Sequence, residues 1–176
     1  MPLNQIALHA AISPEHRALM RFIPENGQIT FHHNGTAPEV VREFIRHIAI
    51  ELLKIPDAPG GLPVEQVSLD GMVCRTMFIP KGMLLAGKIH KLDCINIVAS
   101  GDINILTENG SGRMVAGQRA ISRAGTQKLG FANEDTIFIN IFRCDETTPE
   151  AIENAIAWPS FEAFDATQLL TNNKEN

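Results

Sequence analysis

The residues of this sequence that are best able to do chemistry lie in its middle third: Lys88, His90, Cys94 and Lys128. An imidazole and a thiolate are ligands for soft metals, whereas a lysine ammonium attracts anions. A metal site built on His90 and Cys94 would need further ligands from Asp93 or from a neighbouring subunit. A lysine ligand is unfavourable, because neutralising it costs about 1.36 kcal/mol for each pKa unit between about 10.4 and pH 7, roughly 4–5 kcal/mol in total. We therefore predict no metal at these residues.

Two other interpretations of the same residues stay open. If Lys88, His90 and Lys128 meet at the mouth of a barrel, together with Arg123, they favour an anionic ligand such as a carboxylate, a phosphate or a sugar acid. Alternatively, Cys94 is a small hydrophobic residue of a packed interior, and the lysines are solvated or paired with acidic neighbours. The candidate acidic neighbours are Asp93, Glu134 and Asp135.

The sequence contains no recognisable set of nucleophile, base and orienting residue. The candidate nucleophiles Ser100, Ser111 and Ser122 have no patterned histidine or aspartate partner beyond His90. The Gly110-Ser111-Gly112 stretch follows an expected strand but opens no helix, so it predicts a hairpin turn and not a phosphate-binding loop. We therefore expect neither a catalytic residue nor a bound cofactor.

Short β-rich runs separated by glycine turns surround these residues from position 64 to position 142. A turn occurs about every ten residues, which is typical of a sandwich or a barrel. Over about 80 residues this pattern predicts a small antiparallel jelly roll of about eight strands. The expected strands are residues 73–79, 84–91, 95–100, 103–107, 113–116, 120–123, 127–132 and 136–142.

The residues before the expected jelly roll follow a different pattern. Residues 19–23 and 28–31 predict two strands joined by a Pro-Glu-Asn-Gly turn, an arm that we expect to add strands to a sheet. Thr36 and Glu39 have the spacing of a capping box and Pro38 suits a first helical turn, so we predict a helix over residues 38–54. The proline- and glycine-rich residues 56–63 predict a linker.

Apolar residues recur at helical spacing along the expected helix. Such a stripe is a packing face, either for the barrel or for another subunit. We expect it to serve oligomerisation, because the exposed edges and faces of a jelly roll need covering and a closed homo-oligomer supplies the cover. The residues of this stripe are Val41, Phe44, Ile45, Ile48 and Leu52.

The end of the chain predicts helices. Thr148 and Pro149 open a helix that reaches about residue 157, and Ser160 caps a second helix that reaches about residue 170. The last residues are polar and resemble a frayed tail. The sequence therefore divides into an N-terminal extension (1–63), a jelly roll (64–145) and a C-terminal helical extension (146–176).

Composition limits the class of the protein. Of the 176 residues 44% are apolar, and 15 basic residues stand against 20 acidic ones, a net charge of −5 that argues against a general binder of nucleic-acid phosphates. Cys74, Cys94 and Cys144 form neither a disulfide framework nor a CxxC motif, which favours a reducing compartment. No signal peptide is recognisable and no apolar run approaches the length of about 20 residues that spans a bilayer, so we expect no membrane contact.

Together, the glycines and the chemically capable residues resemble two motifs of the cupin superfamily. In the first motif a glycine precedes two metal-binding histidines, a glutamate and a closing glycine; the second contains a proline-x-glycine turn and a third histidine. The first maps onto Gly82, Lys88, His90, Cys94 and Gly101, and the second onto Gly117, Arg123, Gly125, Lys128 and Ala132. The family's metal-ligand positions therefore hold Lys88, His90, Cys94 and Lys128 here, and the resemblance implies a cupin-like barrel without the family's metal.

More narrowly, residues 65–160 resemble small cupin-like proteins of tailed bacteriophages. The resemblance rests on Ile79-Pro80-Lys81-Gly82, Gly87-Lys88-Ile89-His90-Lys91, Asn96-Ile97, Ala124-Gly125-Thr126 and Glu134-Asp135-Thr136. It implies a non-catalytic structural or interaction protein that is a homo-oligomer, associates with other virion proteins as a capsid decoration, an adaptor or a tail component, and is located in the virion or the host cytoplasm. The alternative is a small-molecule-binding or enzymatic cupin, epimerase-like or dependent on a nonstandard metal, that uses the barrel mouth.

Overall fold

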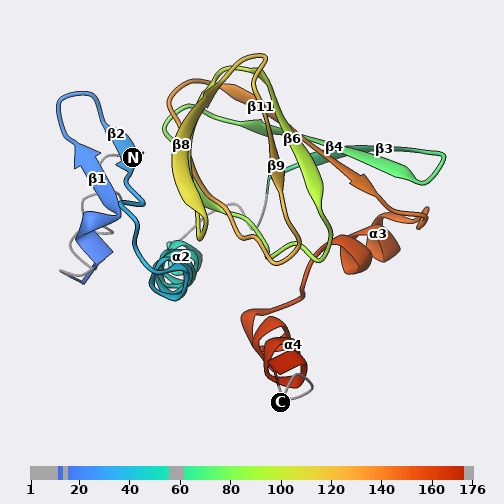
Figure 1. Ribbon diagram of the computed structural model, residues 1–176. Coiled ribbons are helices and arrows are strands. Elements are labelled where there is room, and N and C mark those ends of the chain that lie inside the picture. The colour runs from blue at the N-terminus through green and yellow to red at the C-terminus, as the bar shows by residue number, and fades with distance from the viewer. Residues whose placement is uncertain (1–11, 14–15, 56–61, 173–176) are drawn as a thin grey trace.

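The computed structural model describes residues 12–13, 16–55 and 62–172, with side chains up to Gln168 in the last helix. The protein is mainly β: a barrel of two antiparallel sheets carries a hairpin and a helix on one side and helices below it (Figure 1).

The two sheets of the barrel contain nine strands. The five-stranded sheet has the order β3 (Val64–Leu69), β4 (Met72–Ile79), β11 (Thr136–Arg143), β6 (Cys94–Ser100) and β9 (Arg119–Ser122). The four-stranded sheet has the order β5 (Leu84–Ala86), β10 (Leu129–Ala132), β7 (Asp102–Thr107) and β8 (Gly110–Val115). From β4 to β11 the chain changes sheet at every connection except β7 to β8. This order is that of a double-sheet jelly roll, so the predicted fold class is confirmed.

The eight expected strands correspond to β4–β11, with one shortened and one strand missed. The strand expected over residues 84–91 ends at Ala86, because the backbone after it bonds to a neighbouring loop: Gly125 N–H donates to the His90 carbonyl at 2.7 Å and His90 N–H to the Thr126 carbonyl at 3.2 Å. The strand β3 was not expected; it follows the proline-rich stretch directly and pairs along its whole length with β4.

The N-terminal arm contains a short 3₁₀ helix η1 (His16–Ala18), the strands β1 (Met20–Ile23) and β2 (Gln28–Phe31), and the helix α2 (Pro38–Leu53). The two strands and the helix lie where the sequence predicted them. Within the described chain β1 and β2 pair only with each other, so the arm adds no strand to its own barrel; that it extends the sheet of a neighbouring subunit stays a prediction. The expected capping box is also absent, since Ala37 occupies the N-cap and no side chain caps the helix.

The apolar stripe of α2 packs on the barrel of its own chain. Val41, Phe44, Ile45 and Ile48 are 0% exposed, and Leu52 packs against them. Their partners on the outer face of the four-stranded sheet are Leu106, Leu129 and Phe131. The prediction that this stripe is an oligomerisation face is therefore wrong. The four-stranded sheet has an apolar outer face of its own, and α2 of the same chain packs on that face and buries it. The expected linker falls largely on residues 56–61, outside the described residues.

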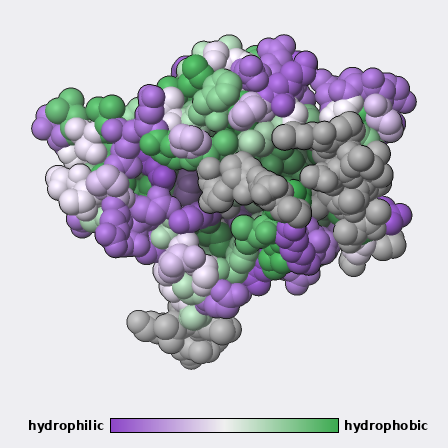
Figure 2. All heavy atoms as spheres, turned by 180° about the vertical axis from the view of Figure 1, so that it is seen from behind, coloured by the Kyte–Doolittle hydropathy of each residue, from purple (hydrophilic) through white to green (hydrophobic). Residues whose placement is uncertain are grey.

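Two helices follow the barrel, as expected. The first, α3 (Pro149–Ile156), is capped by Thr148 Oγ1, which accepts from Ala151 N–H at 3.3 Å, and it packs on Val73 and Phe142 at one end of the barrel. The second, α4 (Phe161–Asn172), is a narrow projection from the body of the molecule (Figure 2). None of the helices within the described residues is long and apolar enough to cross a membrane.

Candidate functional site

The interior of the barrel divides into an apolar end and a polar end. At the apolar end Ile79, Val98, Ile103 and Phe138 form a cluster that both sheets share. At the polar end the adjacent strands β11, β6 and β9 of the five-stranded sheet place polar side chains at buried positions, because alternate residues of a strand face the same side. The inward residues there are Cys94 and Asn96 on β6, Asn140 on β11 and Ser122 on β9.

Hydrogen bonds satisfy this polar end. Asn140 Nδ2 donates to Asn96 Oδ1 at 2.7 Å, and Asn96 Nδ2 donates to Ser122 Oγ at 2.9 Å and to the Ala120 carbonyl at 3.2 Å. A buried polar group without a partner costs about 1–3 kcal/mol, so this chain of amides fixes the three strands relative to one another at little cost.

The structure brings three of the four candidate residues together beside this network. Lys128 Nζ lies 3.5 Å from His90 Nδ1 and 4.0 Å from Cys94 Sγ, and the same imidazole nitrogen lies 3.5 Å from the sulfur. The His90 ring also packs edge-on against Phe142, with ring centroids 5.1 Å apart. The pairing of residues 87–90 with residues 125–128 sets these distances.

Burial shifts all three groups toward their uncharged forms. It lowers the pKa of His90 to about 3, with smaller contributions from the charges of Lys128 and Arg75. It raises the pKa of the Cys94 thiol, although the Lys128 charge acts in the opposite direction. Burial also lowers the pKa of the Lys128 amine, which Cys94 and Glu108 oppose. At neutral pH the imidazole and the thiol are therefore neutral.

A cleft of about 270 Å³ opens beside Lys128. Asn96 and Ser122 line it from the five-stranded sheet, and Thr107 and Met114 line it from the four-stranded sheet. It lies between β8 and β9, which are edge strands of different sheets and are not paired with each other. The cleft offers an entering molecule one amine, amide and hydroxyl groups, and apolar walls.

The other two basic candidates do not line this cleft. Lys88 forms an ion pair with Glu153 of α3 at 2.8 Å and its side chain is 59% exposed. Arg123 pairs with Asp93 at 2.7 Å and is 75% exposed. The predicted mouth formed by Lys88, His90, Lys128 and Arg123 is therefore wrong: residues 87–91 are irregular, so residues two apart need not face the same side.

The residues present do not fit the metal that the cupin resemblance would imply. Lys88 is turned away to Glu153, and the Lys128 amine stands against His90 and Cys94, the two donors that a metal would need. The described residues contain no group of three or more His, Cys, Asp or Glu that could hold a metal ion.

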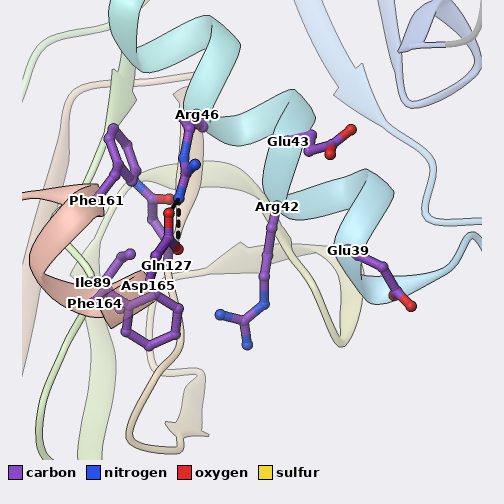
Figure 3. A pocket seen from close by; sticks show the side chains of 9 residues that line it. All are labelled: Glu39, Arg42, Glu43, Arg46, Ile89, Gln127, Phe161, Phe164 and Asp165. Carbon is purple, nitrogen blue, oxygen red and sulfur yellow. Dashed lines mark hydrogen bonds and ion pairs between the residues drawn. The ribbon is translucent and has the colours of Figure 1, made fainter. Parts of the chain in front are cut away.

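A second pocket of about 200 Å³ lies between α2 and α4. Figure 3 shows Arg46 reaching from α2 to the Asp165 carboxylate on α4, which it contacts at 2.8 and 2.9 Å, while Glu39 and Glu43 point away. The Arg46 guanidinium also lies 4.7 Å from the centroid of the Phe161 ring. The Arg46–Asp165 ion pair of this pocket thus attaches α4 to α2.

Sequence reasoning missed the polar residues of the barrel interior. Asn96 and Asn140 occupy buried, inward-facing positions of β6 and β11. In both strands a polar residue stands between isoleucines, and this break in an apolar run was the available signal. It also missed Glu108, which is 3% exposed and pairs with Arg42 of α2 at 3.3 Å. No short-range pattern connects two residues 66 positions apart.

Comparisons with known proteins give structural likenesses only. No protein-family model and no curated protein matches the sequence. Solved structures that align include KdgF from Halomonas sp. (18% identity, TM-score 0.44, 51% of this chain and 84% of that one). An RmlC-like cupin from Shewanella frigidimarina aligns with 17% identity and a TM-score of 0.44, over 53% of this chain and 86% of that one. A cupin-2 domain protein from the same organism aligns with 13% identity and a TM-score of 0.40, over 46% of this chain and 79% of that one. The jelly-roll assignment rests on the strand order of this chain itself.

Proposed function

We propose that this protein is a non-enzymatic, cupin-like interaction protein that works as an oligomer. We place it, following its sequence resemblance, in the virion of a tailed phage as a decoration, an adaptor or a tail component. The observation that carries the interaction function is the outer face of the five-stranded sheet, which is apolar and exposed.

The exposed residues of this face come from every strand of the sheet. Val67 and Leu69 on β3 are each 68% exposed, and Ile121 on β9, at the opposite edge, is 67% exposed. Green side chains reach the surface at the tip of the β3–β4 hairpin (Figure 2, left edge). The further exposed residues are Met72, Phe78, Ile95 and Ile137. Soluble monomers rarely expose a large contiguous apolar patch, so such a surface indicates a partner.

The contrast between the two sheets strengthens this interpretation. The four-stranded sheet buries its apolar outer residues, such as Leu106 and Phe131, under the N-terminal arm. The five-stranded sheet carries comparable side chains, Phe78 among them, with half of their surface in water. Because water-exposed apolar area costs about 25 cal/mol per Å² relative to burial, a partner that covers this face gains affinity from it.

The interior supports a non-enzymatic function. A general base works best when its pKa lies near the working pH, whereas the pKa of His90 is about 3. A cysteine nucleophile reacts as the thiolate, and burial raises the pKa of Cys94. These groups are therefore poorly prepared for catalysis.

Mass spectrometry of purified virions tests the location that we propose. A virion component is expected at a fixed copy number relative to the major capsid protein. Detection only in infected-cell lysate would contradict the virion location and would favour an intracellular function.

A second candidate function is the binding of a small anion, such as a carboxylate, in the barrel cleft. Among the described residues no carboxylate is bonded to the Lys128 amine, whose close polar contacts are His90 and Cys94. A ligand carboxylate in the cleft would supply the missing counter-charge. A screen of carboxylates and phosphates should then raise the melting temperature with concentration, and Lys128→Met should abolish the rise, while EDTA should leave the melting temperature unchanged.

A further inference from the structure

The exposed face of the five-stranded sheet carries opposite charges at its two edges. Glu65 on the edge strand β3 is paired with Thr76, which is followed across the sheet by Ile139, Ile97 and finally Arg119 on the other edge strand β9. Directly paired residues point to the same side of a sheet, so the acid and the base lie at opposite ends of one row on one face. Both end residues are exposed, and neither forms an ion pair with any described residue.

The neighbouring row of the same face is apolar from edge to edge. Val67 is paired with Cys74, and Ile141, Ile95 and Ile121 complete the row. Its two end residues are 68% and 67% exposed, and Ile95 is 43% exposed. This row lies beside the charged row, so apolar side chains fill the centre of the face and charges stand at two of its edges.

We infer that a second copy of this chain docks on this face, with a two-fold axis that runs parallel to the central strand β11. This inference rests on the proposed interaction function and names its partner. A rotation of 180° about that axis places β3 of one copy over β9 of the other. Glu65 then faces the partner's Arg119, and the symmetry repeats the same ion pair at the opposite edge.

The charges select this axis over the other way of stacking two identical sheets. A two-fold axis perpendicular to the strands would place β3 over β3 and β9 over β9. Glu65 and Arg119 would then meet like charges or apolar residues, and both would lose water without gaining a counter-charge. Arg143 is the one further charge along the outer positions of β11, and this axis places it opposite the partner's Arg143. It lies at the end of the strand, beside the β3–β4 hairpin, and is exposed there, so the two side chains have to extend apart into solvent at the rim.

The size of the face suits a homodimer. Five strands about 4.8 Å apart, each about six residues long at about 3.3 Å per residue, present about 500 Å² before the side chains of the rim are added. A standard interface buries about 800 Å² per partner. Two such sheets pack about 10 Å apart, as in a β-sandwich, which lets long edge side chains such as Glu65 and Arg119 reach across.

A charge swap tests this arrangement. Sedimentation equilibrium of the full-length protein should show a dimer. Glu65→Arg or Arg119→Glu alone places like charges at both symmetric contacts and should raise the dissociation constant about tenfold or more. The double variant Glu65→Arg/Arg119→Glu restores opposite charges and should return the constant to within about threefold of wild type. Arg21→Glu, at an exposed site on β1, is the matched control and should leave it unchanged.

A substitution at the centre of the face gives an independent readout. Ile95→Lys should convert the dimer to a monomer without loss of β-sheet circular dichroism, because this side chain is outside the core. A dimer that withstands Ile95→Lys, or single charge variants that the double variant does not rescue, would overturn the inference while leaving an oligomeric interaction protein intact. A wild-type monomer that is present in virions at fixed copy number would overturn the dimer and the oligomeric part of the proposed function, and would retain the virion interaction function.

Discussion

Burial shifts the pKa values of three neighbouring side chains at the polar end of the barrel so that each side chain favours its neutral form. Desolvation favours the neutral form of an imidazole, an amine and a thiol alike. His90, Cys94 and Lys128 therefore form a weakly polar cluster in which no strong ion pair holds the groups together. The consequences appear in the pH dependence of stability.

The first prediction concerns acid. Because the pKa of His90 is about 3 in the folded protein and near 6.5 in the unfolded chain, the unfolded chain binds the extra proton first as the pH falls. This residue therefore costs stability progressively between about pH 6.5 and pH 3. Urea unfolding measures the free energy of unfolding at pH 7 and at pH 4.5. The loss of this free energy between the two pH values should be about 2–3 kcal/mol smaller for His90→Gln than for wild type. Equal pH dependence in the two proteins would contradict the burial of a neutral imidazole.

The second prediction concerns Lys128. Its pKa is lowered, so the folded protein loses the amine proton before the unfolded chain does, and stability should rise with pH up to the ordinary lysine pKa. Lys128→Met removes the desolvated amine and should raise the free energy of unfolding at pH 7 and abolish that rise. The matched variant Lys88→Met removes an exposed ion pair and should change stability by about 1 kcal/mol or less, while the rise of stability toward the ordinary lysine pKa stays in place. Strong destabilisation by Lys128→Met would show that the amine makes a favourable pair.

The third prediction concerns the glycine turns that the sequence singled out. Gly101 has φ +87°, and a Cβ there would overlap the carbonyl oxygen of Asp135 and the backbone of Thr136. Gly82 has φ +78°, and a Cβ added there would meet nothing within 4 Å. Gly101→Ala should therefore cost several kcal/mol or prevent folding, whereas Gly82→Ala should cost about 1–2 kcal/mol from its backbone conformation alone. Urea unfolding and the yield of soluble protein measure both; equal costs would contradict the tight contact at Gly101.

At the scale of elements, the sequence predicted what local rules determine. Glycine turns end strands, and residues with positive φ, such as Gly101 and Gly125, mark those ends independently of the rest of the fold. The helix over α2 and the caps at Thr148 and Ser160 likewise depend on neighbours within four residues. These local signals located eight of the nine barrel strands and the helices of the two extensions, and they missed β3.

The sequence could not predict which element covers which face, because that depends on contacts between distant residues. The apolar stripe on α2 predicts a packing face, but its partners Leu106 and Phe131 follow the helix by more than 50 residues in the sequence. The same limit applies to the site. Lys88 and His90 are two residues apart, which in a strand would place both side chains on the same face, but the strand ends at Ala86 and Lys88 turns to Glu153 instead.

The fourth prediction tests the position of α2. Phe44 is 0% exposed within its own chain, so Phe44→Ala should lower the free energy of unfolding by about 3–5 kcal/mol, independently of protein concentration. Leu53 ends the same helix and is 81% exposed, so Leu53→Ala is the matched control with little effect. If Phe44→Ala instead dissociated an oligomer and left each subunit as stable as before, α2 would be an oligomerisation face after all.

At the scale of the whole molecule, the arm and the barrel share one core. Apolar contacts join α2 and β2 to β7 and β10, and polar contacts reinforce them. Asn104 Nδ2 of β7 donates to the Ile29 carbonyl of β2 at 2.8 Å, and the buried Glu108 carboxylate pairs with Arg42 of α2. Without the arm, the four-stranded sheet would expose an apolar face and leave Glu108 without its arginine.

The fifth prediction follows from this shared core. The N-terminal extension and the jelly roll should unfold in one cooperative transition, with equal calorimetric and van't Hoff enthalpies. Phe44→Ala, at about 3–5 kcal/mol, should move the whole transition down by about 6–20 °C, because 1 kcal/mol shifts the melting temperature of a chain of this size by about 2–4 °C. Two separate transitions, of which Phe44→Ala moved only the first, would show that the arm is an independent module. In that case the four-stranded sheet would have to remain folded with Leu106, Leu129 and Phe131 in water, which the burial of these side chains makes unfavourable.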